Sequence, residues 1–387
     1  MHRERRGEYR VSLTGEEQVR AFVPAPLPPL PGLDLGGTRQ HLLERAALAV
    51  GRLDSISTLL PDPHLFLYSY VRREAVLSSQ IEGTQSSLSD LLLFELEEPP
   101  GTPVDDVVEV SNYVAALTHG LDRLNQGFPL CNRLLREIHA VLMRRGRGSE
   151  KQPGEFRRTQ NWIGGTRPGK AAFVPPPPAE LETCMAELER FLHDTNSGLP
   201  VLVKAALAHV QFETIHPFLD GNGRLGRLLI ALLLHQSGIL SQPLLYLSLY
   251  FKEHRALYYE QLNQVRATGD WESWIDFFLE GVERTAGQAV ETARRIASLF
   301  QADEARLRGL GRRGLSVTRV LAALRERPLL TLNRLVRSQS LSFPAAAKAM
   351  QVLVDRGIVR EITGQRRNRV FAYDGYLRLL NERGQPL

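Results

Sequence analysis

Apolar residues recur along most of this chain at intervals of three and four, the spacing of helices that bury one face. The pattern predicts helices over 42–56, 65–79, 104–124, 132–143, 180–194 and 201–215, and a long one from Trp271 toward Asp303. Residues 228–234 are apolar throughout, which predicts a buried helix. Prolines and glycines interrupt the pattern at 61–63, 97–103 and 217–226. The chain is therefore expected to be mainly α-helical.

Two regions depart from this spacing. Residues 153–178 place aromatic and β-branched residues on both sides of a Gly/Pro turn, which predicts a β-hairpin. Beyond a hinge at 310–314, three helical stretches precede two strand-like stretches around a basic turn, at 317–325, 331–336, 343–356, 357–364 and 369–373. Ser342 is expected to cap the third of these helices. We therefore divide the chain into domains at 1–103, 104–309 and 310–387.

A proline-rich segment, Pro24–Pro31, lies in the N-terminal region. Its composition favours the extended polyproline conformation. It is interpreted either as an arm packed along the domain or as a ligand for a domain of the SH3 type.

Composition places the chain among cytoplasmic globular proteins. Its 387 residues are 43% hydrophobic and 24% charged, enough for two or three domains. No apolar run approaches the ~18 residues of a membrane span, and residues 1–6 lead into no signal-peptide core, so no membrane partner is expected. The two cysteines, Cys131 and Cys184, have no metal-binding spacing and suit a reducing compartment.

Charge is spread unevenly along the chain. Residues 312–369 carry thirteen Arg or Lys against three Asp or Glu, a balance of +10, so the remainder of the +5 total is −5. Such an asymmetry is typical of a segment that faces nucleic acid.

The stretch richest in chemistry is His216-Pro217-Phe218-Leu219-Asp220-Gly221-Asn222-Gly223-Arg224-Leu225-Gly226-Arg227. It links the helix predicted over 201–215 to a buried helix expected to begin at Leu225. Gly221, Asn222 and Gly223 can present consecutive backbone N–H groups to one anion. The positive end of the following helix dipole adds to this attraction. The loop is therefore a candidate anion cradle.

Charged side chains around the loop extend that interpretation. Arg224 and Arg227 are three residues apart, on one side of a helix, where guanidinium groups can bind phosphate oxygens. Asp220 is suited to Mg²⁺, which uses one or two carboxylates together with phosphates. His216 has the side chain best suited to accept a proton near neutrality. Together they indicate a nucleotide-phosphate site with its own base.

Three other interpretations of the loop fit less well. Residues 221–226 match G-x-G-x-x-G, but a helix precedes them and no Asp or Glu occurs between Asp220 and Glu253. A calcium-binding EF-hand loop that begins at Asp220 would need a glutamate where Ala231 stands. A plain surface turn leaves the histidine and the spaced arginines unexplained.

The stretch resembles the signature of the Fic (filamentation induced by cAMP) family, H-P-F-x-[DE]-G-N-G-R-x-x-R, and every fixed position is present. The resemblance covers about residues 65–300 and implies an all-α Fic core. It implies transfer of AMP from ATP to a Ser, Thr or Tyr hydroxyl of a protein, with release of pyrophosphate. The acceptor is then another protein or the chain itself, and ATP and Mg²⁺ are required.

The resemblance also implies a role for each motif residue. His216 is the base that deprotonates the acceptor hydroxyl, and Asp220 holds Mg²⁺ on the α- and β-phosphates. Residues 221–223 form the anion hole, Arg224 contacts the β-phosphate and Arg227 the γ-phosphate. The nucleotide-binding set is Gly221, Asn222, Gly223, Arg224, Leu225, Gly226, Arg227 and Tyr259.

A second pattern lies near the end of the helix predicted over 65–79. Ser78 and Glu82 are four residues apart, before Gly83, which suits a helix end. Alone, this is typical of a helix C-terminus with a solvated glutamate. Beside the motif it resembles the inhibitory helix of one Fic subclass, which implies that Glu82 pairs with Arg227 and restrains the enzyme. Such a bond, ~1.5–3 kcal/mol, would suppress productive ATP binding about tenfold to a hundredfold.

The predicted hairpin resembles the Fic flap, which pairs with the main chain of a target by strand addition. A hairpin with a purely structural role is the alternative. The flap residues expected to dock the target are Ile163, Gly164 and Gly165.

Three further side chains bear on the nucleotide. Tyr259 lies in a segment similar to the one that lines the family's nucleoside pocket, although an aromatic of the helical core is the alternative. Arg266 stands where some members have an asparagine that touches adenine, so the contact to the base stays open. His139 is interpreted as a packing histidine rather than a catalytic one.

The C-terminal pattern resembles a winged helix-turn-helix domain, with Arg366, Arg367 and Arg369 on the wing, suited to DNA phosphates. A protein-interaction or dimerisation domain of the same fold is the alternative. The expected function is a self-restrained protein adenylyltransferase. Its rivals are a DNA-binding regulator that only senses nucleotide, and a Fic enzyme that uses UTP or GTP or removes AMP. Oligomeric state is left open, with a homodimer among the alternatives.

Overall fold

The computed structural model describes residues 6–14, 17–59, 63–97, 99, 101–310 and 314–381. The hinge expected at 310–314 lies mostly outside the described residues. The helices are α1 Thr38–Leu59, α2 Pro63–Ile81, α3 Leu88–Phe94, α4 Val104–Asn125, α5 Asn132–Leu142, η1 Pro168–Lys170, α6 Pro178–His193, α7 Val201–Ile215, α8 Asn222–Gln236, α9 Ser248–Glu253, α10 Arg255–Thr268, α11 Trp271–Arg306, α12 Gly314–Glu326, α13 Leu332–Gln339, α14 Phe343–Asp355 and α15 Asp374–Asn381. The strands are β1 Gly7–Thr14, β2 Glu17–Pro24, β3 Leu329–Thr331, β4 Arg360–Glu361 and β5 Val370–Ala372. The prediction of a mainly helical protein is confirmed.

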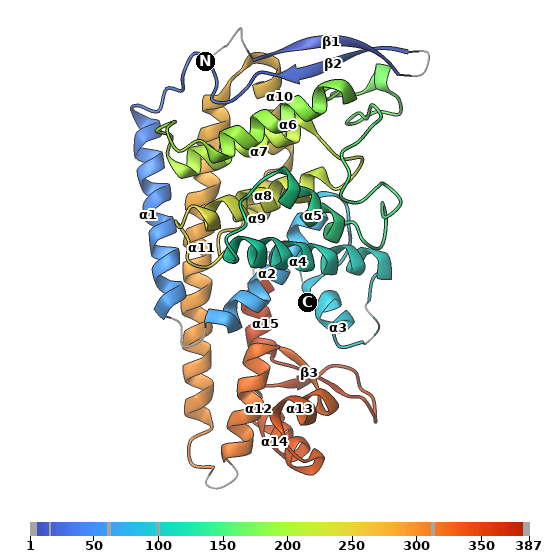
Figure 1. Ribbon diagram of the computed structural model, residues 1–387. Coiled ribbons are helices and arrows are strands. Elements are labelled where there is room, and N and C mark those ends of the chain that lie inside the picture. The colour runs from blue at the N-terminus through green and yellow to red at the C-terminus, as the bar shows by residue number, and fades with distance from the viewer. Residues whose placement is uncertain are drawn as a thin grey trace.

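Two helices, α7 and α8, pack against each other inside the main helical body, in the upper part of the view (Figure 1). Every residue of α7 from 205 to 215 and of α8 from 225 to 234 is buried, the few polar ones included, because apolar residues occur on every side of both helices. The loop that joins them is therefore anchored on both sides by core packing. Trp274 of α11 donates a hydrogen bond to the Ala206 carbonyl (2.9 Å), which fixes α11 against α7.

The long helix α11 runs from this core down to the C-terminal helices, and α1 lies along it (Figure 1). Two ion pairs secure α1, between Arg39 and Asp276 (2.7 Å) and between Arg45 and Glu283 (3.0 Å). One continuous apolar core joins residues from Leu42 to Leu380. No helix among the described residues combines the length and apolar character that a membrane crossing requires.

The N-terminal strands β1 and β2 form an antiparallel hairpin that the sequence pattern did not lead us to predict. Its signal was present as alternation of apolar and polar residues, for example Val19, Ala21 and Val23 on β2. The proline-rich segment follows it, and Gln211 of α7 donates to the Ala25 carbonyl (2.9 Å). This contact packs the start of the segment against the core.

The hairpin predicted over 153–178 is reduced to one antiparallel bridge, between Ile163 and Phe173. Gly164 and Gly165 both have positive φ, 68° and 76°, which bends the chain away from strand geometry. The prolines at 175–178 have no N–H with which to extend a ladder. We call residues 161–174 the flap. β2 supports it, because the Phe22 N–H donates to the Val174 carbonyl (2.9 Å).

The C-terminal region contains α12, α13 and α14 with an antiparallel sheet of order β3-β5-β4, close to the predicted elements. Strand β3 and helix α15 were not predicted. Ser342 occupies the N-cap position of α14, but its side chain makes no capping hydrogen bond. Arg366, Arg367 and Arg369 are exposed between β4 and β5.

Candidate functional site

The candidate site lies where α7 ends. His216 is the C-cap of α7 in the left-handed conformation (φ 51°), and its N–H donates to the Phe212 carbonyl (2.9 Å). Pro217 follows, so the chain cannot continue as a helix. Buried Arg157 holds this turn, donating to the carbonyls of His216 (3.0 Å) and Pro176 (2.5 Å). His216 as a whole is partly buried, and Nδ1 of its imidazole is buried without a hydrogen-bond partner among the described residues.

The helix after the loop begins at Asn222 rather than at Leu225, so the expected boundary was wrong. Gly221 is its N-cap with φ 77°, a conformation that glycine adopts without strain, and this lets α8 start earlier. The Asn222 amide spans the loop, accepting from the Phe218 N–H (2.9 Å) and donating to its carbonyl (2.8 Å). The first N–H groups of α8, including that of Gly223, have no partner within the helix and form its anion-binding end.

Arg227 is enclosed by the end of α2. Its Nε donates to Ser78 Oγ (2.8 Å), and its Nη2 donates to the Ser78 carbonyl (3.0 Å) and to Glu82 Oε1 (2.7 Å). The Arg227 side chain is 2% exposed, whereas that of Glu82 is 37% exposed. The structure thus places Glu82 against Arg227, the pair that the family resemblance implied, and adds Ser78 as a second partner of Arg227.

Glu82 also covers the anion-binding end of α8. A Cβ placed on Gly223 would lie 2.3 Å from Glu82 Oε1, so the carboxylate rests directly on this glycine. Burial acts to raise the pKa of Glu82, but the charge and hydrogen bond of Arg227 outweigh it, so the net pKa is lowered. Glu82 is therefore an anion at neutral pH and sits where the loop would receive another anion.

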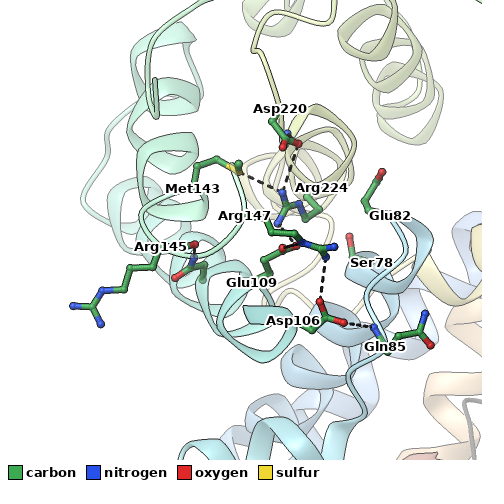
Figure 2. Close-up of polar contacts among 12 residues, drawn as sticks. Ser78, Glu82, Gln85, Asp106, Glu109, Met143, Arg145, Arg147, Asp220 and Arg224 are labelled. Carbon is green, nitrogen blue, oxygen red and sulfur yellow. Dashed lines mark hydrogen bonds and ion pairs between the residues drawn. The ribbon is translucent and has the colours of Figure 1, made fainter. Parts of the chain in front are cut away.

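Arg224 points to a different set of partners (Figure 2). Its Nη1 donates to Glu109 Oε2 of α4 (3.3 Å), and its Nη2 contacts Met143 Sδ (3.3 Å). Asp220 lies further off, with 3.9 Å between its Oδ1 and Nη2 of Arg224. Asp220 Oδ1 accepts the Gly221 N–H (2.6 Å), and this side chain is about half exposed.

The environment of His216 keeps its imidazole neutral. Burial, followed by the nearby positive charges of Arg266 and Arg157, lowers the pKa of His216 to about 3. At pH 7 the ring is therefore neutral with a free lone pair, and its pKa lies below the near-neutral value expected from the residue type.

Arg266 is fully engaged by protein groups. It donates to Thr214 Oγ1 (3.2 Å) and to the Glu213 carbonyl (3.1 Å), and its guanidinium lies 4.1 Å from the centre of the Phe173 ring in the flap. It thus joins α10, the end of α7 and the flap. Tyr259 of α10 is 38% exposed, and its pKa is raised by burial and then by the negative charge of Glu82.

His139 contacts the main chain of the loop. Its Nδ1 accepts the Gly154 N–H (2.8 Å), so Nε2 carries the proton and donates to the Asp220 carbonyl (3.0 Å). The ring stacks on Phe218 at 3.7 Å, and burial lowers its pKa to about 4. These contacts are those of a packing residue that shapes the loop.

Sequence reasoning missed two residues of the site, Arg157 and Glu109. Both act through contacts distant in sequence, with Arg157 59 positions from His216 and Glu109 115 positions from Arg224. No local motif marks either. The available signal was that Glu109 is a charged residue on the buried face of α4, which indicates a buried partner of opposite charge.

Comparison with known proteins places this site in a family. Residues 40–122 match the model described as Fic/DOC family N-terminal, and residues 129–234 match that described as Fic/DOC family. Protein adenylyltransferase Fic of Culex quinquefasciatus is 34% identical over 209 residues, 53% of this chain and 39% of the relative. The protein of the same name from Aedes aegypti is 33% identical over the same shares. The chain thus spans about two fifths of the length of these relatives.

Solved structures agree on the fold. The crystal structure of a Fic family protein from Desulfovibrio desulfuricans G20 has a TM-score of 0.59 at 20% identity, over 89% of this chain and 98% of that one. A Fic domain containing signaling protein from Bacteroides thetaiotaomicron has a TM-score of 0.53 at 20% identity, over 65% and 97%. This chain therefore contains a Fic/DOC family N-terminal region at residues 40–122 and a Fic/DOC family domain at residues 129–234.

Proposed function

We propose that the protein is an adenylyltransferase that moves AMP from ATP to a hydroxyl of a protein, and that Glu82 restrains it. The observation that carries the proposal is the geometry around the start of α8. There the first N–H groups of the helix and two buried arginines of α8 lie next to the loop that begins at a neutral histidine. The match to the family model and the names of the relatives agree with it.

In this proposal His216 takes the proton of the acceptor Ser, Thr or Tyr. The oxygen then attacks the α-phosphorus, an O–P bond forms, and the bond to the pyrophosphate leaving group breaks. The N–H groups at the start of α8 stabilise charge on the α-phosphate, because they are fixed before reaction. Arg224 and Arg227 orient the β- and γ-phosphates. Of the flap residues, Gly164 and Gly165 are exposed and Ile163 is partly buried, and the three would hold the acceptor segment.

Mg²⁺ fits the donor set of the site. Among the described residues no group of three His, Cys, Asp or Glu side chains could enclose a metal ion. Mg²⁺ does not need one, since it is usually held by one or two carboxylates together with phosphates and water. The half-exposed Asp220 carboxylate beside the anion-binding helix end would supply that contact. The bound ion would neutralise phosphate charge.

The restraint by Glu82 follows from the contacts of Arg227. With its Nε and Nη2 occupied by Ser78 and Glu82, that arginine has no free edge for a γ-phosphate. More than a third of the Glu82 side chain is exposed, so solvent screens the pair, and we expect an effect near the lower bound, about tenfold.

Both the transfer of AMP and its restraint by Glu82 can be tested with α-³²P-ATP. The measurement is the label transferred to the protein itself or to proteins of a cell extract. We expect Glu82→Gly to raise transfer about tenfold. His216→Ala in the Glu82→Gly protein should abolish transfer while MgATP still protects the protein against heat. A Glu82→Gly protein that transfers no AMP either to itself or to any protein of the extract would refute the transferase, and equal transfer with and without Glu82 would refute the restraint.

We also propose that the C-terminal region contacts DNA. Support comes from its +10 charge and from the exposed Arg366, Arg367 and Arg369 between β4 and β5. Binding to a duplex should weaken steeply with salt, and Arg366→Ala with Arg367→Ala should lower the salt dependence by about two counterions. If the protein does not bind a DNA duplex even at about 50 mM salt, where phosphate contacts are weakly screened, a protein-binding role is favoured.

A further inference from the structure

Arg224 is held by a carboxylate of its own, outside the motif. Glu109 Oε2 accepts from Nη1 of Arg224 (3.3 Å), and both side chains are almost completely buried. The other edge of the guanidinium is left open. Its Nε has no hydrogen-bond partner among the described residues, and its Nη2 contacts only the Met143 thioether, a weak acceptor, within 3.5 Å.

The two motif arginines therefore differ in which edge is used. In Arg227, Nε and Nη2 are filled by Ser78 and Glu82. In Arg224 the corresponding Nε–Nη2 edge is available, because Glu109 binds through Nη1 alone. A phosphate binds a guanidinium best through two parallel N–H groups, so Arg224 is already oriented for one.

Glu109 is itself fixed from a second side (Figure 2). Arg147 donates through Nε to Glu109 Oε1 (2.7 Å), and its Nη2 lies 3.2 Å from Asp106 Oδ1. Asp106 in turn accepts the N–H of Gln85 (2.7 Å), three residues beyond Glu82. The Arg147 side chain is 58% exposed, whereas the carboxylates it joins are nearly buried. Glu109 therefore stays in place when Arg224 exchanges its other partners.

Without the charge of Glu109, Arg224 would be a buried cation whose nearest remaining carboxylate is Asp220, now 3.9 Å away. Rotation toward Asp220 would turn the Nε–Nη2 edge of Arg224 out of its present orientation. We propose that Glu109 is a positioning residue that holds the Nε–Nη2 edge of Arg224 toward the β-phosphate of a bound nucleotide. The inference rests on the proposed function in one respect, the placement of a nucleotide on α8.

The proposal predicts a defect that depends on the number of phosphates. Glu109→Gln keeps the size and one acceptor of the side chain but removes its charge. Affinity for ADP, measured by calorimetry with the full chain and excess Mg²⁺, should fall about tenfold, the scale of one charge-assisted hydrogen bond. Affinity for AMP, which has no β-phosphate, should change by less than about twofold.

Two further variants separate positioning from general damage. Glu109→Asp keeps the charge but shortens the side chain. Its affinity for ADP should therefore also fall more than its affinity for AMP, but by a smaller factor than in Glu109→Gln. Glu137→Gln removes a carboxylate of α5 that pairs with Arg123 of α4 and Arg133 of α5. It should leave the affinities for ADP and for AMP unchanged. Circular dichroism melting checks that each variant is folded.

Equal losses for ADP and AMP, or no loss for either, would overturn the role of Glu109 and leave the transferase proposal standing. The same holds if Glu109→Gln is unfolded and folded Glu109→Asp binds ADP normally. A parent protein that binds neither ADP nor ATP would overturn both. The selective loss of ADP affinity in Glu109→Gln and Glu109→Asp supports the inference.

Discussion

His216 illustrates how its surroundings, more than its residue type, set the charge of a single side chain. Burial and the charges of Arg266 and Arg157 lower its pKa to about 3, against an ordinary value of about 6.5. We expect the ring to stay neutral from pH 8 to pH 5. In protein with ¹³C-labelled histidine, the His216 signal should show no titration step in this range.

The spectrum of His216→Ala assigns the signal, and a midpoint near pH 6.5 would contradict this environment. The same shift affects stability with a definite sign. In the unfolded chain the histidine binds a proton near its ordinary pKa, whereas in the folded chain it binds one only near pH 3. Its contribution to the free energy of unfolding is therefore complete above about pH 6.5 and is lost as the pH falls toward 3.

At the scale of residues, the sequence predicted what lies within one short motif and little of what supports it. The pattern that contains Ser78 and Glu82, read with the family resemblance, implied the contact between Glu82 and Arg227. The contact between Ser78 and Arg227 was not predicted. Glu109 and Arg157 could not be found this way, since each meets its partner only after several helices have packed. Their spacing to the motif carries no periodic signal.

At the scale of elements, α11 contains two glycines in different surroundings. A Cβ on Gly281 would lie 2.7 Å from Cδ1 of the buried Tyr250 ring, whereas a Cβ on Gly287 would have no atom within 4 Å among the described residues. We expect Gly281→Ala to lower the free energy of unfolding by about 1–3 kcal/mol, because the ring and helix must separate. Gly287→Ala, on the same helix, should raise it by about 0.5–1 kcal/mol.

Chemical denaturation of the two variants measures the difference, with Gly287→Ala as the internal control. A Gly281→Ala protein as stable as the parent would show that α11 and α9, which carries Tyr250, are packed less tightly than the distances indicate. Because α11 also carries Trp274, which is bonded to α7, loosening it should weaken the site as well as the fold.

Helices of this chain were predictable because each buries an apolar stripe, as α4 and α5 do, and the stripe shows in the sequence. The strands were harder to predict. The β1–β2 hairpin is polar on one face of β2, and the flap is a single bridge whose shape depends on Gly164, Gly165 and the support of Phe22. The start of α8 was misplaced because glycines are poor helix formers unless, as at Gly221, they serve as a cap.

At the scale of the whole molecule, the C-terminal region packs against the helix that carries Ser78. Arg334 of α13 donates to the Glu95 carbonyl just beyond α3 (2.8 Å). The Glu95 side chain binds two residues of α2, accepting from Arg72 Nε (2.9 Å) and from the Tyr68 hydroxyl (2.5 Å). A path of direct contacts therefore runs from α13 to α2, whose far end restrains Arg227.

If this path steadies α2, then weakening it should loosen the hold of Glu82. We expect Arg334→Ala to raise AMP transfer about 2- to 30-fold, the range for residues that change a coupling by ~0.5–2 kcal/mol. Arg337→Ala, an exposed position on the same helix, is the matched control and should leave transfer unchanged. In the Glu82→Gly protein, Arg334→Ala should have no further effect, because the restraint it acts on is gone. Activation by Arg334→Ala that persists without Glu82 would show that the C-terminal region acts on the site by another route.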